Sequence, residues 1–181
     1  YKVEYVDVRP ISGALANLAV FYACTKPGDN VMSLSVMSGA HISYREFGSA
    51  GCRGLKVADI PFDSEEMNIE LERFSDLARK VRPKIITVGG SLFLFPSPVR
   101  EVRKMADEVG AIVHYDGAHV MGLILGGKFQ DPLAEGAQIL TGSTHKTLPG
   151  PQGGVLLTNN EDMFKSLKKA IYPGLVSNHH L

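Results

Sequence analysis

Short apolar runs alternate with segments of helical period along most of the chain. The short runs are rich in β-branched residues and predict strands at residues 31–34, 55–58, 85–88, 112–115, 139–141 and 155–158. Apolar positions at helical spacing predict helices over Gly13–Cys24, residues 69–81, Val99–Val109 and residues 162–171. This alternation is typical of the α/β class, in which helices on both faces cover a mostly parallel sheet.

Glycine and proline mark the connections between these elements. Lys26-Pro27-Gly28-Asp29 and Phe95-Pro96-Ser97-Pro98 predict turns, with Pro98 in the first turn of the following helix. The sequence shows no repeat and no linker, so we expect one domain over residues 1–181. Tyr1 leads directly into a strand-like segment at residues 2–8, and the last four residues are Asn-His-His-Leu. We therefore expect a fragment of a longer chain.

Composition narrows the classes of partner. The 181 residues are 44% hydrophobic, which is enough for a sizeable core, and the 19 Lys and Arg balance the 19 Asp and Glu. A balanced charge offers no basic field for nucleic acid or for a membrane surface. Cys24 and Cys52 lack zinc or redox spacing, and no apolar stretch reaches the ~20 residues that span a bilayer. We expect a cytoplasmic protein with small-molecule or protein partners.

The strongest chemical signal is Ser143-Thr144-His145-Lys146-Thr147, followed by Gly150-Pro151-Gln152-Gly153-Gly154 and a strand. This pattern places a lysine between hydroxyls and glycines. A lysine amine that loses its proton can attack an aldehyde and form a Schiff base. The alternative interpretation is an ordinary solvated loop lysine, because most lysines are surface groups.

Asp116 follows an apolar strand and should lie at its carboxyl end, where open α/β sheets bind ligands. A carboxylate there could keep the pyridine nitrogen of pyridoxal phosphate protonated. The alternative interpretation is a helix N-cap. His119, three residues later, could line the same pocket or be a packed, hydrogen-bonded imidazole.

Ser12-Gly13-Ala14 forms a turn of small residues before a predicted helix. Free backbone N–H groups and the positive end of the helix dipole could bind a phosphate there. A simple serine-capped helix would have the same sequence.

In this order, Ser-Gly-Ala-x-Ala-Asn, Asp-x-x-His and Ser-Thr-His-Lys-Thr resemble the large domain of serine hydroxymethyltransferase, a fold-type I pyridoxal-phosphate enzyme of the aspartate-aminotransferase-like class. The resemblance covers nearly the whole chain. It includes Lys26-Pro27-Gly28-Asp29, the segment from Ala106 to Ala111, the segment from Asp116 to Leu123, and His145-Lys146-Thr147-Leu148 with its Gly-Pro-x-Gly-Gly tail. Several segments match in register, which makes the resemblance specific.

The resemblance implies a role for each matching residue. Lys146 would form the Schiff base, Asp116 would contact the ring nitrogen, and Ser12 with the amides of Gly13 and Ala14 would hold the phosphate. His41 would stack on the ring. The resemblance places the other candidates near the cofactor: Ser91 close to the ring hydroxyl, His119 beside the ring, Thr144 and His145 flanking the lysine, and Gly153 and Gly154 at a phosphate site shared across a homodimer.

The resemblance further implies interconversion of serine and glycine by making or breaking the Cα–Cβ bond of an amino-acid substrate, and it leaves open whether a folate is a second partner. The chain departs from the family at Pro149 and Gln152, where arginines are usual, and at residues 92–96. Folate dependence therefore stays open.

Three alternatives remain open from the sequence. One is a threonine-type aldolase or transaldolase that uses no folate. Another is a metal hydrolase built on His114-x-Asp116-x-x-His119, because two imidazoles and a carboxylate could hold a divalent ion. The last is a relative that keeps the fold without catalysis.

Overall fold

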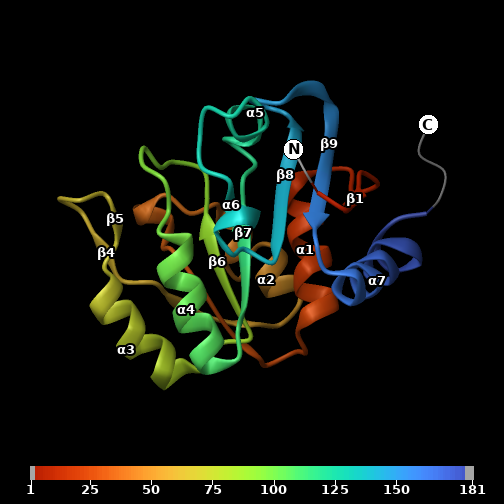
Figure 1. Ribbon diagram of the computed structural model, residues 1–181. Helices are drawn as coiled ribbons and strands as arrows, with labels where there is room; N and C mark the ends of the chain where they lie inside the picture. Colours follow the sequence, from red (N-terminus) through yellow and green to blue (C-terminus); the bar gives the residue numbers. More distant parts are fainter. Residues whose placement is uncertain (1–2, 178–181) are drawn as a thin grey trace.

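A seven-stranded sheet forms the centre of the protein, as the computed structural model, which describes residues 3–177, shows (Figure 1). The strand order is β1-β9-β8-β7-β6-β2-β3. Strands β8, β7, β6, β2 and β3 are parallel, whereas β9 is antiparallel to both β8 and β1. The strands are β1 (Tyr5–Asp7), β2 (Asn30–Ser33), β3 (Lys56–Asp59), β6 (Ile85–Gly89), β7 (Ile112–Asp116), β8 (Ile139–His145) and β9 (Pro149–Thr158).

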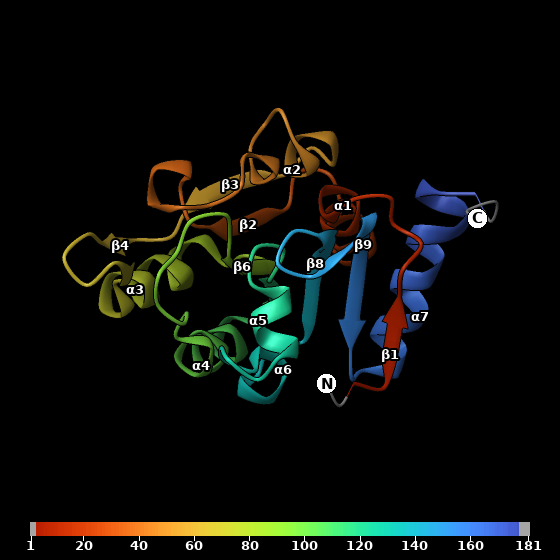
Figure 2. The ribbon, with the colours of Figure 1, turned by 90° about the horizontal axis from the view of Figure 1, so that it is seen from above.

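Helices lie on both faces of this sheet (Figure 2). One face carries α1 (Gly13–Cys24), α2 (Ser49–Cys52) and α7 (Glu161–Lys169), and the other carries α3 (Leu71–Val81), α4 (Val99–Val109) and α6 (Pro132–Glu135). The short α5 (Met121–Leu125) follows β7. The other elements of the described residues are two 3-10 turns, η1 (Val36–Ser38) and η2 (Ile42–Tyr44), a kinked π-helical segment, η3 (Ala170–Leu175), and a two-stranded ribbon of β4 (Phe62–Asp63) and β5 (Asn68–Ile69). The fold is therefore the α/β arrangement that the sequence predicts.

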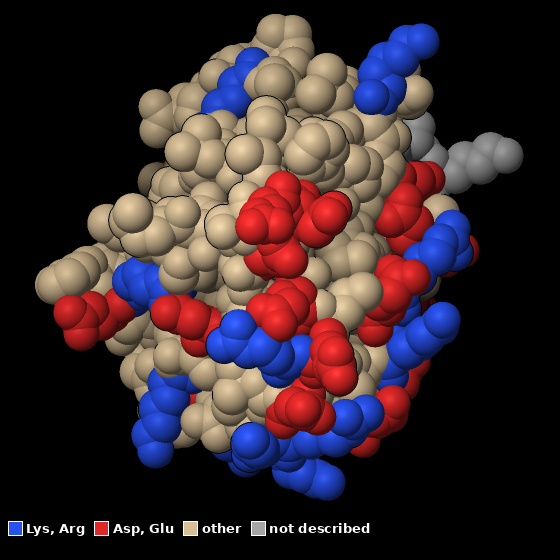
Figure 3. All heavy atoms as spheres, turned by 90° about the vertical axis from the view of Figure 1, so that its left-hand side faces the viewer, with Lys and Arg blue, Asp and Glu red and all other residues tan. Residues whose placement is uncertain are grey.

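The polarity of each helix matches its position in these layers. Helix α1 is apolar around its circumference and buries Ala16, Ala19 and Val20, because the sheet, α2 and α7 surround it. Helices α3 and α4 bury one apolar stripe each and expose charged side chains, which form pairs such as Arg79 with Glu108 at 3.1 Å. Charges of both signs interleave over the lower half of the face shown in Figure 3. No helix among residues 3–177 is long and apolar enough to cross a bilayer.

The predicted elements agree with the structure except at three places. The helix expected over residues 69–81 begins at Leu71, because Asn68–Ile69 pairs with Phe62–Asp63 in the ribbon. Pro98 precedes α4 as its N-cap and is not in its first turn. Around Lys146, β8 and β9 extend beyond their predicted ends and form a tight hairpin, so that Lys146 lies in the short loop between them. Of the strand expected over residues 2–8, Lys2 lies outside the described residues.

Candidate active site

A pocket of about 270 Å³ opens at the carboxyl ends of β6, β7 and β8, beside the amino end of α1. Parallel α/β sheets bind ligands at this edge, because the loops that follow the strands converge there. Twelve residues line the pocket: Ser12, Gly13, Ala14, Asn17, His41, Ser91, Asp116, Ala118, His119, Ser143, His145 and Lys146. Nine of them are site residues that the sequence predicts, drawn from segments far apart in the chain.

Asp116 is the buried carboxylate that lines this pocket. It is the last residue of β7, and only 3% of its surface is exposed. Its Oδ1 accepts a hydrogen bond from the backbone N–H of Ala118 at 2.9 Å, and its Oδ2 accepts from Asn17 Nδ2 at 2.9 Å and from the hydroxyl of Tyr44. Helix α5 begins only at Met121, so Asp116 is not its N-cap. The donors hold the carboxylate in one orientation.

Lys146 lines the same pocket from the turn between β8 and β9. Its Nζ is 3.1 Å from Nε2 of His119. Thr147 fixes this pair, because its hydroxyl donates to the carbonyl of His119 at 2.9 Å and accepts from the amide of Gly122 at 3.2 Å. Lys146 is exposed, as the solvated-lysine interpretation expects, but its amine reaches a pocket histidine. Burial, together with the nearby charge of Lys146, lowers the pKa of His119.

The amino end of α1 forms the third side of the pocket. The Ser12 hydroxyl caps the helix by accepting from the amide of Leu15 at 3.1 Å. The interpretation of Ser12 as a helix cap is therefore correct. The amides of Gly13 and Ala14 donate to no other described residue. A Cβ on Gly13 would lie 2.6 Å from the Ser143 hydroxyl, so this close packing favours glycine. The result is a cradle of backbone N–H groups beside two serine hydroxyls.

Two loops bring His41 and Ser91 to the pocket. Gly39 has φ of +95°, and a Cβ there would lie 1.9 Å from the carbonyl oxygen of Leu92. The carbonyl of Gly39 in turn accepts from the amide of Ser91 at 2.8 Å. The loops therefore pack backbone against backbone, which only glycine permits at this position.

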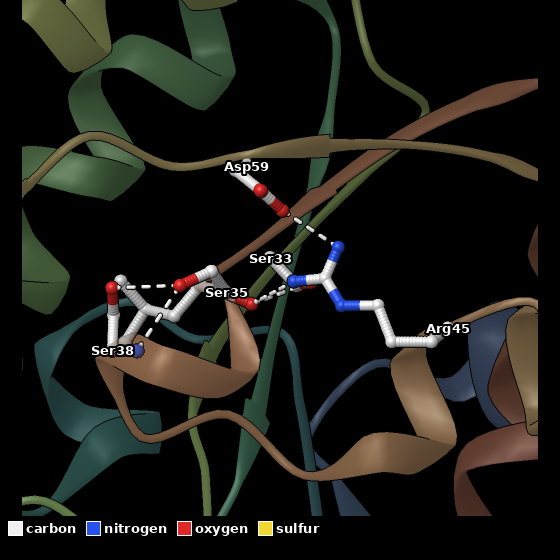
Figure 4. Close-up of polar contacts among 6 residues, drawn as sticks. Ser33, Ser35, Ser38, Arg45 and Asp59 are labelled. Atoms are coloured by element: carbon white, nitrogen blue, oxygen red, sulfur yellow. Dashed lines mark hydrogen bonds and ion pairs between the residues drawn. The ribbon is translucent and has the colours of Figure 1, made fainter.

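Arg45 anchors the segment that carries His41 to the edge of the sheet (Figure 4). Its Nη1 lies 2.6 Å from Asp59 Oδ1, and its Nη2 donates to the carbonyl of Leu34. At the other end of the segment, Ser35 Oγ caps η1 by accepting from the amide of Ser38 at 3.1 Å. Arg45 thus holds the loop and is not available to a ligand in the pocket.

Comparison with known proteins identifies the family. The model of the serine hydroxymethyltransferase family matches residues 1–180. The chain belongs to the serine hydroxymethyltransferase family. It is 52% identical over its whole length to the serine hydroxymethyltransferase of Methanocella arvoryzae and 56% identical to that of Methanocaldococcus jannaschii, and it is 54% identical over 184 aligned residues to that of Pyrococcus abyssi. The chain spans about two-fifths of the length of these relatives, between 42% and 43%.

Three candidates carried over from the serine hydroxymethyltransferase family do not line the pocket of this chain. The Thr144 hydroxyl donates to the carbonyl of Pro151 at 2.6 Å and so stabilises the hairpin. The amide of Gly154 donates to the carbonyl of Pro10 at 2.7 Å, and a Cβ on Gly154 would lie 2.2 Å from the Ser12 carbonyl oxygen. Gly153 packs against Thr144. Within this chain these residues position the hairpin and the α1 turn, and the role of Gly153 and Gly154 at a phosphate site shared across a homodimer stays a prediction.

Sequence reasoning missed several polar residues behind the pocket of this family member. Tyr44 and Asn17 both donate to Asp116, although each is almost completely buried at 1% and 2% exposure. Asn17 stands in the Ser-Gly-Ala-x-Ala-Asn motif, and a buried asparagine on an apolar helix face is a signal that could have identified it. Tyr44 carries no comparable signal, because a tyrosine in an apolar segment is ordinary core.

His114, the residue on which the metal-hydrolase alternative depends, is completely buried. Its Nδ1 lies 3.2 Å from the Thr87 hydroxyl and its Nε2 lies 2.8 Å from the Thr141 hydroxyl, so both ring nitrogens have partners. Among residues 3–177, no three His, Cys, Asp or Glu side chains are grouped so that they could hold a metal ion. The geometry does not support the metal-hydrolase hypothesis.

We expect His114 to make folding stability depend on pH. Burial lowers its pKa to about 4, although Asp116 acts in the opposite direction. The unfolded chain binds this proton below about pH 6.5, so the folded state should lose up to about 3 kcal/mol as the pH falls from ~6.5 to ~4. Urea unfolding of the full-length protein across this range should show a smaller pH dependence for His114→Gln. Equal slopes for the two proteins would contradict this prediction.

Proposed function

We propose that the full-length protein that contains this chain is a pyridoxal-phosphate-dependent serine hydroxymethyltransferase, which interconverts serine and glycine at the Cα–Cβ bond. The observation that carries the proposal is the convergence of three groups on one pocket. These are the buried carboxylate of Asp116, the amine of Lys146 beside His119, and the free amides at the amino end of α1. The membership of the chain in the serine hydroxymethyltransferase family supports the same reaction.

The donor set of the pocket fits this cofactor. Ser12 and the amides of Gly13 and Ala14 would hold the phosphate, because a helix amino end favours an anion. Asp116 would accept from the protonated ring nitrogen through the remaining lone pair of Oδ1. His41 would lie against the ring, Ser91 would bond the ring hydroxyl, and Lys146 would hold the cofactor covalently. When bound, pyridoxal phosphate supplies an electron sink for cleavage at Cα.

The residues of the chain itself would position groups and move protons around this cofactor. His119 has a pKa lowered by burial and by Lys146, which favours its neutral form, so Nε2 can accept a hydrogen bond from the amine of Lys146, whose Nζ lies 3.1 Å away. The lysine amine is nucleophilic only without its extra proton. His145 lines the pocket next to Lys146 and would contact the cofactor or the substrate from the same side.

The test of this proposal is chemical mapping of the lysine. The full-length protein, incubated with pyridoxal phosphate, reduced with borohydride and digested, should carry a pyridoxyl group on the peptide that contains Lys146. Lys128→Ala, at an exposed lysine that does not line the pocket, is the matched control and should leave this labelling unchanged. Labelling of another lysine in the native protein would refute the proposal.

The proposed partners are an amino-acid substrate, a folate and a second copy of the chain in a homodimer, and the proposed location is the cytoplasm. Pro149 and Gln152 stand where arginines are usual in the family, which keeps a folate-independent aldolase as the second candidate. Serine cleavage measured with and without a tetrahydrofolate acceptor separates the two. Acceptor-independent cleavage of threonine that exceeds cleavage of serine would favour the aldolase.

A further inference from the structure

A continuous chain of hydrogen bonds runs through the buried side of the sheet and ends at Asp116. Thr87 Oγ1 lies 3.2 Å from His114 Nδ1, and His114 Nε2 lies 2.8 Å from Thr141 Oγ1. Thr141 Oγ1 lies 2.6 Å from Asn17 Oδ1, and Asn17 Nδ2 lies 2.9 Å from Asp116 Oδ2. The four residues before Asp116 come from β6, β7, β8 and α1, and none exposes more than 2% of its surface.

The register of the sheet brings these side chains together. Thr87 pairs with His114, and Asp116 pairs with Thr141, in adjacent parallel strands. Alternation along β7 puts His114 and Asp116 on the same face, and that face is the one covered by α1, which carries Asn17. The neighbouring strand positions, such as Ile86 and Val113, are apolar. Polar groups buried at such depth are costly unless each has a partner.

The carboxylate of Asp116 determines which group donates and which group accepts in each hydrogen bond of this series. An ionised carboxylate only accepts hydrogen bonds, so Asn17 must present its amide NH₂ to Oδ2 and its carbonyl oxygen to Thr141. The Thr141 hydroxyl has one proton and donates it to that carbonyl. Its oxygen can then only accept from His114, so Nε2 of His114 must carry the ring proton.

Because His114 is neutral, the donor and the acceptor in its hydrogen bond with Thr87 are fixed as well. Burial lowers the pKa of His114 to about 4. Among the described residues, the charged group that influences this pKa is Asp116, which raises it. From the α1 side the imidazole meets the ring of Phe21, edge to face at 6.3 Å, which carries no charge. A neutral imidazole with a proton on Nε2 has a bare Nδ1, which accepts from the Thr87 hydroxyl. The reverse direction would leave the buried Asn17 oxygen without a donor.

We propose that Thr87, His114, Thr141 and Asn17 form a directional relay that orients Asp116, and that these four are positioning residues for the proposed active site. Successive bonds in one direction polarise one another, so the last donor, Asn17, binds the carboxylate more strongly than an isolated amide would. The functional part of this inference rests on the proposed cofactor. The direction of the relay is a property of the protein alone.

The first experiment tests this direction without the cofactor. Nitrogen-15 NMR of the full-length, cofactor-free protein, with His114→Gln used to assign the signals, reports which ring nitrogen carries the proton. We expect a protonated Nε2 and a bare Nδ1 on His114, unchanged between about pH 5.5 and pH 8. A proton on Nδ1, or a change of charge within this range, would overturn the relay even if the protein binds pyridoxal phosphate well.

The second experiment tests whether the relay acts on Asp116. Thr141→Val keeps the shape but removes the hydroxyl, and we expect it to weaken pyridoxal-phosphate binding on the order of tenfold and to shift the pH titration of the bound cofactor's absorbance. Thr141→Ser should restore both. Thr158 is the matched control, because it is equally buried and its hydroxyl donates to the Gln138 carbonyl, away from Asp116.

The two variants separate positioning from general packing. Thr158→Val should destabilise the fold without changing the absorbance titration. If Thr141→Val and Thr158→Val give the same titration as the native protein, Thr141 is structural only and the positioning role is wrong. If the native protein does not bind the cofactor, the proposed function fails, while the NMR result still decides the direction of the relay.

Discussion

Asp116→Asn should reduce serine cleavage by the full-length protein on the order of 10²-fold or more while leaving it folded. The substitution keeps the volume of the side chain but removes the negative charge that would face the ring nitrogen of the proposed cofactor. A neutral amide cannot stabilise a protonated pyridine ring in a site that is only 3% exposed. The measurements are steady-state rates and the dissociation constant of pyridoxal phosphate, with near-normal turnover as the result that rejects the assigned role.

The same substitution should also lower stability, for a separate reason. Asp116 accepts from three donors, namely the amide of Ala118, Asn17 Nδ2 and the Tyr44 hydroxyl. Either orientation of an asparagine amide would direct its own NH₂ at one of these donors, at a cost of about 1–3 kcal/mol. Asp7→Asn is the matched control, because Asp7 is a buried carboxylate in β1 that pairs with Arg9. The control should lose stability but retain turnover.

The elements that the sequence predicts best are those whose signal is local. Helices α1 and α4 have the predicted bounds, because a serine cap starts the first and a glycine in the left-handed conformation ends the second. The strand-end rule likewise identifies Asp116, since an apolar run followed by a carboxylate is visible in the sequence alone. The lysine hairpin was harder to predict, because the extension of β9 depends on pairing with β8.

The contacts behind the pocket could not be predicted, because they join residues that are distant in the sequence. Tyr44 and Asp116 are 72 positions apart, and Asn17 and Thr141 are 124 positions apart. No periodicity or motif links such pairs. The buried threonines and His114 look like ordinary strand residues until the register of three parallel strands aligns them. The sequence predicted nine of the twelve residues that line the pocket, whereas the structure was needed to identify those that hold Asp116.

The group that would bind the substrate carboxylate is not apparent in the described pocket. None of the residues that line it is an arginine, and Lys146 is its one non-histidine cation among residues 3–177. Arg9 pairs with Asp7, and Arg45 pairs with Asp59. Arg53 stacks on Tyr22 at 4.5 Å and donates to a backbone carbonyl. The remaining arginines lie in or beside α3 and α4, on the far side of the sheet from α1.

The 181-residue chain expressed alone should therefore show no measurable serine cleavage, at least ~10³-fold below the full-length protein, even with pyridoxal phosphate and a one-carbon acceptor. Cleavage at Cα requires the breaking bond to be held perpendicular to the cofactor ring, and that orientation needs a fixed hold on the substrate carboxylate. The curated relatives are more than twice as long as this chain, and we expect the part of the full-length protein outside residues 1–181 to supply that hold.

In this experiment the isolated chain should bind the cofactor but should not cleave serine. Lys146, Asp116 and Ser12 all line the pocket of the isolated chain, so absorbance titration should still detect bound pyridoxal phosphate, and Lys146→Ala in the same chain should abolish that signal. Glycine formation is assayed in the same sample, with the full-length protein as the positive control. Robust serine cleavage by the isolated chain would show that residues 1–181 already contain the carboxylate-binding group. An absence of cofactor binding together with an absence of turnover would instead indicate that the pocket needs the rest of the protein to form.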